Sequence, residues 1–395
     1  MRVLFIFHMA SMKGGASKSG LSLVKGLKDS GHEIFAVTPA EGTLANELRN
    51  AGISVKLIRF DWVLPCFRKD AVGAVKFIPA AVRNFFFNKT AYSELLRYAQ
   101  EISPDIIHSN SSVINVGYKV AKKLNIPHVT HFREIGFSDC GAFMPHKKEM
   151  LGYRYQYSIG IGKIVFDSHS LGVSHKNKVI YNGIVDAGQC RENNSAKQFL
   201  LFVGGLFKSK GIEDLLIAYS KLPMDIKRMY PLKIAGSTPI ESYFSKLKSL
   251  AEKLGITEYV EWLGERNDID DLMFGARALL VPSHNEGFGR IVIEALRNGT
   301  LVIGRNNAGI KEQFDNGVEL TGGEIGLRYS AIEELTDRML DVCRSNSQKY
   351  DAFIKRGQTT ICNLYSVQQY IDNVDRFYKF AISDWHENQC NNGLL

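Results

Sequence analysis

Short apolar runs alternate with stretches of helical spacing along the whole chain. The first run, RVLFIFHM, is followed by the glycine-containing loop ASMKGGASKSG, a helical stretch to Asp29 and a second apolar run, EIFAVTP. Strand, glycine loop, helix and strand form the opening βαβ unit of a parallel sheet. The runs expected to form further strands of this half are SVKLIRF, DIIHSN, HVTHF, KIVFDS and KVIYNG.

A polar stretch, DAGQCRENNSAKQ, then interrupts the pattern, and the same rhythm restarts after it with FLLFVGGLF, LKIAGS, VEWLGE, ALLVPS and TLVIGR. Two successive halves of this kind predict an α/β protein with two facing Rossmann-like domains. We expect an N-terminal domain at 1–185, a linker at 186–198 and a C-terminal domain at 199–370. A final helix at 371–395 is expected to pack back toward the N-terminal domain. Ligands of open α/β sheets bind beyond the carboxyl ends of the strands, so the interdomain cleft is the expected site.

The composition agrees with two cytoplasmic globular domains. A chain of 395 residues is too long for one ordinary core, and 45% hydrophobic with 23% charged residues is typical of soluble proteins. No stretch approaches the roughly 18–20 apolar residues that cross a bilayer, and the N-terminal run is interpreted as a strand and not an export signal. The six scattered cysteines show no metal-type spacing and are expected to be thiols.

The positive charge is concentrated in the first half of the chain. Residues 1–197 hold 26 Lys and Arg against 15 Asp and Glu, whereas residues 198–395 hold 23 against 26. The segment CFRKDAVGAVKFIPAAVRNFFFNKT mixes basic residues with phenylalanines and suits a surface that touches anionic lipid. Ordinary helices that pack these phenylalanines inward are the alternative. Nucleic acid would also explain the charge, but no recognition module is present, so we expect peripheral association with the inner face of the plasma membrane.

The stretch NEGFGRIVIEA carries the chemistry of the second half. Its loop follows a strand and precedes a helix expected to begin at Gly289 or Arg290, where free N–H groups favour a phosphate. Gly287 and Gly289 allow close approach of the main chain to a ligand. Glu286 can accept hydrogen bonds from hydroxyl groups, and Glu294, one turn into the helix, can hold a diol such as a ribose. A plain helix start with an acidic first turn is the simpler interpretation.

This pattern resembles the E-x7-E signature of the retaining glycosyltransferases of family four, which have the GT-B fold. Other parts of the chain resemble that family in the expected order. They are SMKGGAS, PDIIHSNSS, IPHVTHFREIG, KVIYNGIVD, VGGLFKSKGIEDLLIAY and RNGTLVIGRNNAGIKEQFDNG.

The resemblance implies a role for each matching position. Lys210 would hold the donor diphosphate together with the N–H groups of Gly287, Phe288 and Gly289. Glu286 would contact the transferred sugar, and Glu294 the nucleotide ribose. The members of the implied site outside this group are Gly14 and Gly15, which would close over the phosphate, and His131, which would line the cleft.

One departure from the family pattern concerns the phosphate site. Many family members have an arginine where this chain has Gly205, and Arg290 is the candidate to supply the missing charge, unless it is an exposed first-turn residue. Taken alone, Lys210 is an ordinary loop lysine and His131 an ordinary histidine at a strand end. Arg133 and Glu134 can simply pair with each other.

The resemblance implies a retaining, hexosyltransferase-type enzyme. It would move a sugar from a nucleotide-diphosphate sugar to a glycan or lipid-linked acceptor, in the synthesis of cell-surface polysaccharide. No DxD-like motif lies in a suitable loop, so neither a metal nor another cofactor is expected. Two alternatives stay open: a GT-B sugar-nucleotide epimerase, and a catalytically silent nucleotide-sugar-binding scaffold subunit, which Gly205 favours. The donor sugar, its base, the acceptor, the linkage and the oligomeric state are not encoded in these patterns.

Overall fold

The computed structural model describes residues 1–63, 71–135, 156–186, 188–192 and 197–391. Contacts between Cα atoms divide the chain into two units. Unit 1 comprises Met1–Gly183 and Val367–Leu395, and unit 2 comprises Ile184–Ser366. The expected linker at 186–198 therefore falls within unit 2, and its residues 187 and 193–196 lie outside the described residues.

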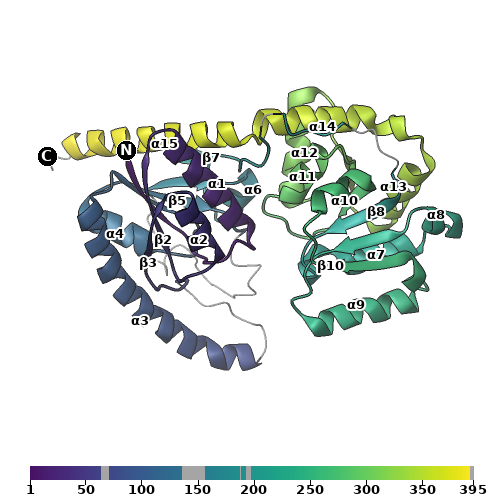
Figure 1. The fold of residues 1–395 in the computed structure, drawn as a ribbon, viewed down its shortest axis with the longest axis horizontal. Coiled ribbons are helices and arrows are strands. Elements are labelled where there is room, and N and C mark those ends of the chain that lie inside the picture. The colour runs from purple at the N-terminus through teal and green to yellow at the C-terminus, as the bar shows by residue number, and fades with distance from the viewer. Residues whose placement is uncertain (64–70, 136–155, 187, 193–196, 392–395) are drawn as a thin grey trace. The chain divides into compact units, whose positions relative to one another are not determined.

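Unit 1 is a doubly wound parallel sheet with the strand order β3-β2-β1-β4-β5-β6-β7 (Figure 1). The order reverses between β1 and β4, the place at which ligands of such sheets bind. Its elements are β1 Arg2–Ile6, α1 Gly15–Asp29, β2 Glu33–Thr38, α2 Thr43–Asn50, β3 Ser54–Leu57, α3 Ala71–Ile102, β4 Ile106–Ser109, α4 Val116–Leu124, β5 His128–Phe132, β6 Tyr157–Gly160, α6 Lys163–Ser168, β7 Asn177–Val179 and α15 Val367–Asn391.

Alternate residues of β1 enter two separate cores, because successive side chains of a strand point to opposite faces of the sheet. Val3 and Phe5 pack with leucines of α1 and with the aromatic residues of α15. Leu4 and Ile6 pack with α4 and with the C-terminal half of α3. Both faces of the sheet are thus covered, which explains the near-continuous apolar runs of its strands.

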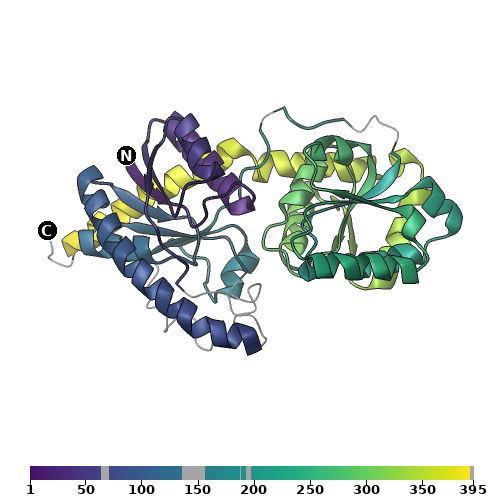
Figure 2. The same cartoon turned by 60° about the horizontal axis from the view of Figure 1, so that its bottom comes forward.

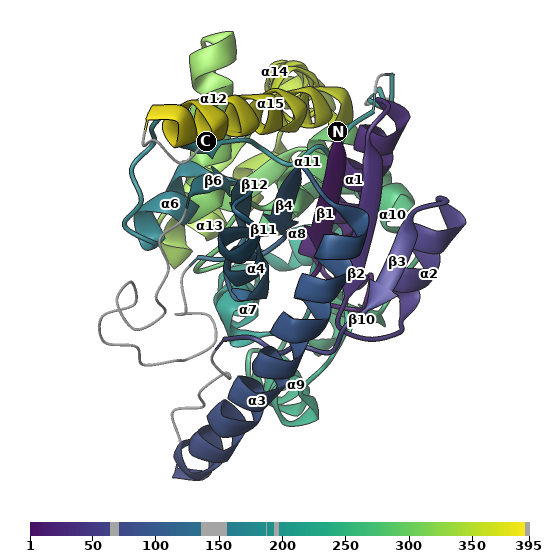
Figure 3. The same ribbon diagram turned by 90° about the vertical axis from the view of Figure 1, so that its left-hand side faces the viewer.

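The last helix, α15, belongs to unit 1 although it follows unit 2 in sequence. It packs against α1, where Ile371 lies so close to Gly26 that a Cβ at Gly26 would be 1.9 Å from its Cδ1 atom. Farther along α15, Asp384 accepts a hydrogen bond from the Tyr157 hydroxyl at 2.6 Å. Figure 3 shows α15 and α3 on opposite sides of the unit 1 sheet.

Unit 2 is a second doubly wound parallel sheet, with the order β10-β9-β8-β11-β12-β13 and helices on both faces (Figure 2). The order reverses between β8 and β11. Its elements are β8 Phe199–Val203, η2 Lys208–Lys210, α7 Ile212–Ser220, α8 Met224–Met229, β9 Leu232–Ala235, α9 Glu241–Lys253, η3 Thr257–Tyr259, β10 Val260–Gly264, α10 Ile269–Gly275, β11 Ala276–Val281, α11 Arg290–Arg297, β12 Val302–Arg305, α12 Ala308–Thr321, β13 Leu327–Tyr329, α13 Ile332–Arg344, η4 Ser347–Tyr350 and α14 Asp351–Leu364.

The predicted class, two Rossmann-like domains with parallel sheets, is confirmed. One predicted strand is wrong: KIVFDS forms the helix α6, and the strand that pairs with β5 and β7 is Tyr157–Gly160 instead. A six-residue apolar run does not distinguish a strand from a buried helical turn by its period. Here the extended Gly162 starts a helix that buries Val165 and Phe166.

Two of the six cysteines come together in unit 2, which their positions in the sequence do not indicate. Cys190 and Cys362 have their Sγ atoms 3.6 Å apart, and both are free thiols. Cys343 is a buried free thiol, while Cys66 and Cys140 lie outside the described residues. Across the described parts of the chain, every helix is either too short or too polar to span a bilayer.

Candidate active site

The loop between β11 and α11 and the first residue of α11 hold half of the ten predicted site residues. The helix begins at Arg290, and Gly289 caps it with a left-handed backbone (φ 76°), a conformation that favours glycine. The loop is held by α12: the Gly309 N–H donates to the Glu286 carbonyl at 2.8 Å, and the Gln313 amide donates to the Phe288 carbonyl. Five of the predicted residues therefore lie at one helix N-terminus.

Lys210 reaches this loop from the next strand of the sheet. It ends the short helix η2, which follows β8, and the next residue, Gly211, has a φ of 69°. A Cβ at Gly211 would be 2.1 Å from the Pro282 carbonyl oxygen, so only glycine lets η2 approach the end of β11. The His284 N–H also donates to the Ser209 carbonyl at 2.9 Å.

This close approach creates an ion pair at the switch point of the unit 2 sheet. The Lys210 Nζ atom lies 2.5 Å from the Glu286 Oε2 atom. The side chains keep 30% and 20% of their surface exposed, respectively. An ammonium group has three donors and a carboxylate has about four acceptor sites, so the pair leaves both groups able to bind a ligand.

A second charged cluster lies beside the pair and was not predicted from the sequence. Asp214, in the first turn of α7, pairs with Arg305 and lies 3.5 Å from His284 Nε2. Arg305 also donates to the Pro282 carbonyl at 3.2 Å. Asp214 follows the Lys-Gly pair by a few residues in the quoted motif, but nothing in the sequence pairs it with Arg305. The cluster braces the loop between β11 and Glu286.

Arg290 and Glu294 lie one helical turn apart, with Arg290 Nη2 3.4 Å from Glu294 Oε1. Both side chains are about three-quarters buried. The residue that departs from the family pattern, Gly205, has space for a side chain if Phe207 moves. A Cβ there would be 2.8 Å from the ring of Phe207, whose side chain is exposed.

The remaining predicted residues, Gly14, Gly15 and His131, all belong to unit 1. Gly14 caps α1, and Gly15 is the first residue of that helix, so their backbone lies at a helix N-terminus as expected. A Cβ at Gly14 would make only ordinary contact with Met9, so packing alone does not require glycine there. The predicted residues thus form two groups, one in each unit.

His131 is completely buried and part of a polar network. Arg133 Nη2 lies 3.3 Å from His131 Nδ1, and His108 Nε2 lies 3.3 Å from the same atom. A guanidinium only donates, so His131 Nδ1 accepts, His108 Nε2 donates, and His108 Nδ1 accepts from the Tyr378 hydroxyl at 2.7 Å. Both imidazoles are then neutral, and His131 Nε2–H has no partner among the described residues.

The electrostatics of the network agree with neutral imidazoles. Burial, with the nearby Arg133 charge, holds the pKa values of His108 and His131 well below their usual range. Arg133 itself does not take Glu134 as a side-chain partner in the described contacts. Its guanidinium donates to Asn110, Asn182 and Tyr370, at 2.8, 2.7 and 3.0 Å.

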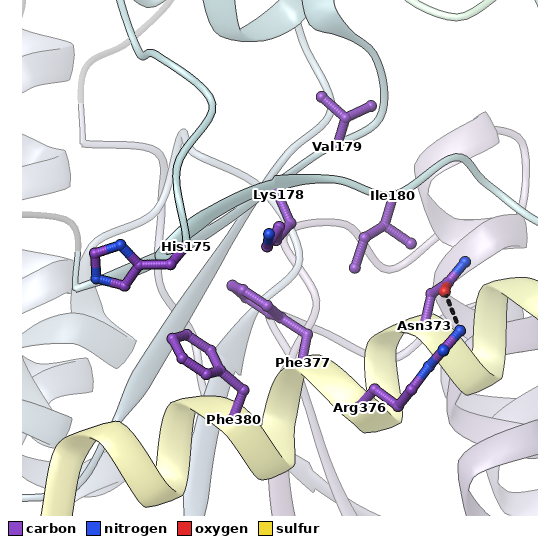
Figure 4. A pocket seen from close by; sticks show the side chains of 8 residues that line it. All are labelled: His175, Lys178, Val179, Ile180, Asn373, Arg376, Phe377 and Phe380. Atoms are coloured by element: carbon purple, nitrogen blue, oxygen red, sulfur yellow. Dashed lines mark hydrogen bonds between the residues drawn. The ribbon is translucent and has the colours of Figure 1, made fainter. Parts of the chain in front are cut away.

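A pocket of about 340 Å³ lies in unit 1 between β7 and α15 (Figure 4). Figure 4 shows Phe377 and Phe380 extending from α15 toward β7, with Arg376 hydrogen-bonded to Asn373. None of the predicted site residues lines it, so it is separate from the candidate site. Its lining residues are His175, Lys178, Val179, Ile180, Asn373, Arg376, Phe377 and Phe380. Nowhere in the described ranges do three His, Cys, Asp or Glu side chains gather in a way that could hold a metal ion.

Comparison with known proteins identifies the class. The family model described as Glycosyltransferase Family 4 matches residues 13–157, and the model described as Glycosyl transferases group 1 matches residues 189–360. Both units are therefore similar to glycosyltransferase domains, and the two doubly wound sheets have the GT-B fold.

Individual relatives agree with this class. The lipopolysaccharide glucosyltransferase WaaG of Escherichia coli is 33% identical over 116 residues, which are 29% of this chain and 30% of that protein. An uncharacterized glycosyltransferase of Haemophilus influenzae is 26% identical over 345 residues, which are 82% of this chain and 92% of that protein. The crystal structure of HepE from Anabaena in complex with UDP-glucose has a TM-score of 0.72 at 20% identity, covering 95% of this chain and 98% of that one.

Proposed function

We propose that this chain is a retaining glycosyltransferase, hexosyltransferase in type, that uses a nucleotide-diphosphate sugar as donor. The acceptor is a hydroxyl of a glycan or lipid-linked molecule, and the reaction belongs to cell-surface polysaccharide synthesis in the cytoplasm. The observation that carries the proposal is the partly exposed Lys210–Glu286 pair at the switch point of unit 2. The partial match to a lipopolysaccharide glucosyltransferase and the HepE complex with UDP-glucose support the choice of substrate class.

The diphosphate is held by positive charge and by backbone donors. Lys210 supplies a cation, and Gly287, Phe288 and Gly289 lie directly before α11, whose N-terminus favours an anion. Gly14 and Gly15 offer the same kind of N-terminus at α1 in unit 1. Arg290 lies at the start of α11 and adds a second cation near the phosphate in place of the arginine missing at Gly205.

The two carboxylates bind hydroxyl groups of the donor. One carboxylate oxygen of Glu286 accepts a hydrogen bond from Lys210, and the other accepts a hydrogen bond from a hydroxyl of the transferred sugar. Glu294 accepts from the ribose diol, with Arg290 holding its orientation at 3.4 Å. His131 remains a proposed residue of the cleft: its Nδ1 atom accepts from Arg133, and its Nε2–H, without a partner among the described residues, would donate to the substrate.

The reaction follows a front-side route. The diphosphate leaves the anomeric carbon while the acceptor hydroxyl approaches the same face, and the departing phosphate oxygen takes the hydroxyl proton. The bond to the acceptor oxygen therefore forms on the face from which the diphosphate departs, and configuration is retained. The protein contributes orientation and charge stabilisation, because Lys210 and the α11 amides lie where negative charge grows on the leaving group. The proposal includes no metal.

The experiment is a transfer assay with a panel of nucleotide-diphosphate hexoses and candidate glycan and lipid-linked acceptors. We expect one donor to give a product whose anomeric configuration, read by NMR, equals that of the donor. Glu286→Gln keeps the size of the side chain and should lower kcat by a factor of about 10²–10³. An inverted product would contradict the retaining mechanism, and full activity of Glu286→Gln would contradict the site.

A further inference from the structure

The helix α3 has two halves with opposite surroundings. Its C-terminal half is buried in the core of unit 1 through Ala91, Leu95 and Ala99. Its N-terminal half instead exposes large apolar side chains to solvent. These are Val75 at 75% exposure, Ile78 at 69%, Val82 at 51%, Phe85 at 66% and Phe86 at 61%.

The exposed side chains form one stripe, which we call the α3 outer face (Val75, Ile78, Val82, Phe85 and Phe86). Their spacing of three, four, three and one residues keeps all five within about 100° around the helix. Of the twelve exposed large hydrophobic residues in the described parts of the chain, five lie here. Such clustering marks an interaction surface, whereas single exposed apolar residues do not.

The opposite side of the same helical turns is fastened to the protein, so the orientation of the outer face is set by specific bonds. Asn84 is buried, and its amide donates to the Trp62 carbonyl at 3.0 Å. The Asn88 carbonyl oxygen accepts from the Asp61 N–H at 3.0 Å. Around the helix, Asn84 lies about 150° and Asn88 about 110° from the centre of the apolar stripe. Figure 3 shows this end of α3 extending beyond the sheet of unit 1.

The charged residues of this half of α3 have one sign. From Ala71 to Ser93 the helix contains Lys76, Arg83 and Lys89 and no acidic residue. All three basic side chains are exposed, and one of them, Arg83, also lies 3.7 Å from Asp61. Lys76 and Arg83 border the stripe along one edge. Lys89 lies in line with the stripe itself, about one turn beyond Phe85 and Phe86. A second copy of the chain docked here would bring equal positive charges together, which disfavours a symmetric dimer.

We propose that the α3 outer face lies on an anionic lipid bilayer. Its phenylalanines and aliphatic residues enter the boundary between headgroups and acyl chains, while the basic residues meet the phosphates. The helix lies along the surface and does not cross it. The inference stands on the helix alone and does not depend on the proposed function, although it would hold the enzyme beside a lipid-linked acceptor.

The test is sedimentation of the full-length protein with vesicles of phosphatidylcholine alone and of phosphatidylcholine mixed with phosphatidylglycerol. The wild-type protein should bind the mixed vesicles and bind the neutral ones at least about tenfold more weakly. The double variant Phe85→Ser/Phe86→Ser should lose at least about tenfold in binding to the mixed vesicles. Lys76→Glu/Lys89→Glu should weaken the same binding and remove its dependence on salt.

A matched control is Met224→Ser/Met229→Ser, which removes two exposed apolar residues of α8 in unit 2. It should leave vesicle binding unchanged, and far-ultraviolet circular dichroism should show all variants folded. Equal binding of the wild type and the phenylalanine variant would overturn the proposal. So would a lipid-free dimer that only the phenylalanine variant disrupts, because that result assigns the face to a second copy.

Discussion

The two units share one topology but use the switch point of the sheet differently. In unit 1 the polar groups beyond β4 and β5 bond to one another, and His108 and His131 have no exposed surface. In unit 2 the groups beyond β8 and β11 are an ion pair with a fifth to a third of each side chain exposed. Position in the fold therefore brings polar residues together in both units, and exposure decides which of them can meet a ligand.

The difference also appears in the kind of bond that holds each cluster. Arg133 is buried with neutral hydrogen-bond partners, and burial, with the Arg133 charge as a second cause, lowers the pKa values of the neighbouring imidazoles. Lys210 and Glu286 neutralise each other at the surface, where an incoming phosphate and a sugar hydroxyl can join the pair. Unit 1 thus has a buried polar network at this place, and unit 2 has a partly exposed ion pair.

The largest expected effect is acid destabilisation of unit 1 alone. Burial lowers the pKa of His8 to about 4 and that of His128 to about 3, and it lowers the pKa values of His108 and His131 as well. Unfolded histidines titrate near 6.5, so below that pH the unfolded chain binds protons that folded unit 1 does not. Stability should fall from about pH 6.5 downward, by about 2 kcal/mol per buried histidine at about pH 5.

Hydrogen–deuterium exchange, corrected for the intrinsic rate at each pH, measures this loss in peptides from β1, β4 and β5. Unit 2 is the internal control, because its single histidine, His284, has a half-exposed side chain. Protection of β8 and β11 should change little over the same range. Equal loss of protection in both units would contradict the comparison.

The next largest effect is a loss of unit 2 stability when the close approach of η2 to β11 is blocked. Gly211→Ala adds a Cβ that would lie 2.1 Å from the Pro282 carbonyl oxygen, at a φ of 69°. It should cost unit 2 about 3 kcal/mol or more, since a clash is added to backbone strain. Gly255→Ala is the matched control, because its φ of 65° carries the same strain but nothing lies within 4 Å of the new atom.

Urea unfolding followed by a unit 2 signal would rank the two variants. The control should lose about 1 kcal/mol, the usual cost of a left-handed backbone without glycine. If both variants lose the same stability, the close approach at Pro282 is not what positions Lys210.

A smaller effect is expected from restoring the missing arginine. Gly205→Arg needs only a shift of the exposed Phe207 ring, and it would add a cation beside the proposed diphosphate position. Affinity for the nucleotide diphosphate, measured by isothermal titration calorimetry, should rise about tenfold. Gly205→Ala, which adds bulk without charge, should show no gain, and a gain in that control would remove the electrostatic explanation.

Most of the fold was predictable because most strands are short apolar runs between turns and helices. KIVFDS is too short for its period to decide between strand and helix, and the short strands Tyr157–Gly160 and Leu327–Tyr329 were not predicted. The glycine loop and the start of α11 were also visible in the sequence, since Gly289 and the periodic residues after it define a helix start. The bonds that hold the loop were not, because Gly309, Gln313 and Asp214 act through contacts between distant segments.

His131 shows the other limit of the sequence. A polar residue at the end of a buried strand looks the same whether it points into a site or into the protein, and only the partners Arg133 and His108 show that it is buried. Tyr378, which bonds to His108, comes from the last helix of the chain. No local pattern connects segments that are so far apart.

The central claim is that Lys210 and its partner form the donor site. The most direct measurement is the affinity of the full-length protein for its nucleotide-diphosphate sugar in Lys210→Met, compared with Lys208→Met. Both lysines belong to η2, but only Lys210 lies 2.5 Å from Glu286, and Lys208 is exposed. We predict that Lys210→Met weakens binding by about tenfold to a hundredfold and that Lys208→Met leaves it unchanged. Equal affinity in the two variants would contradict the account.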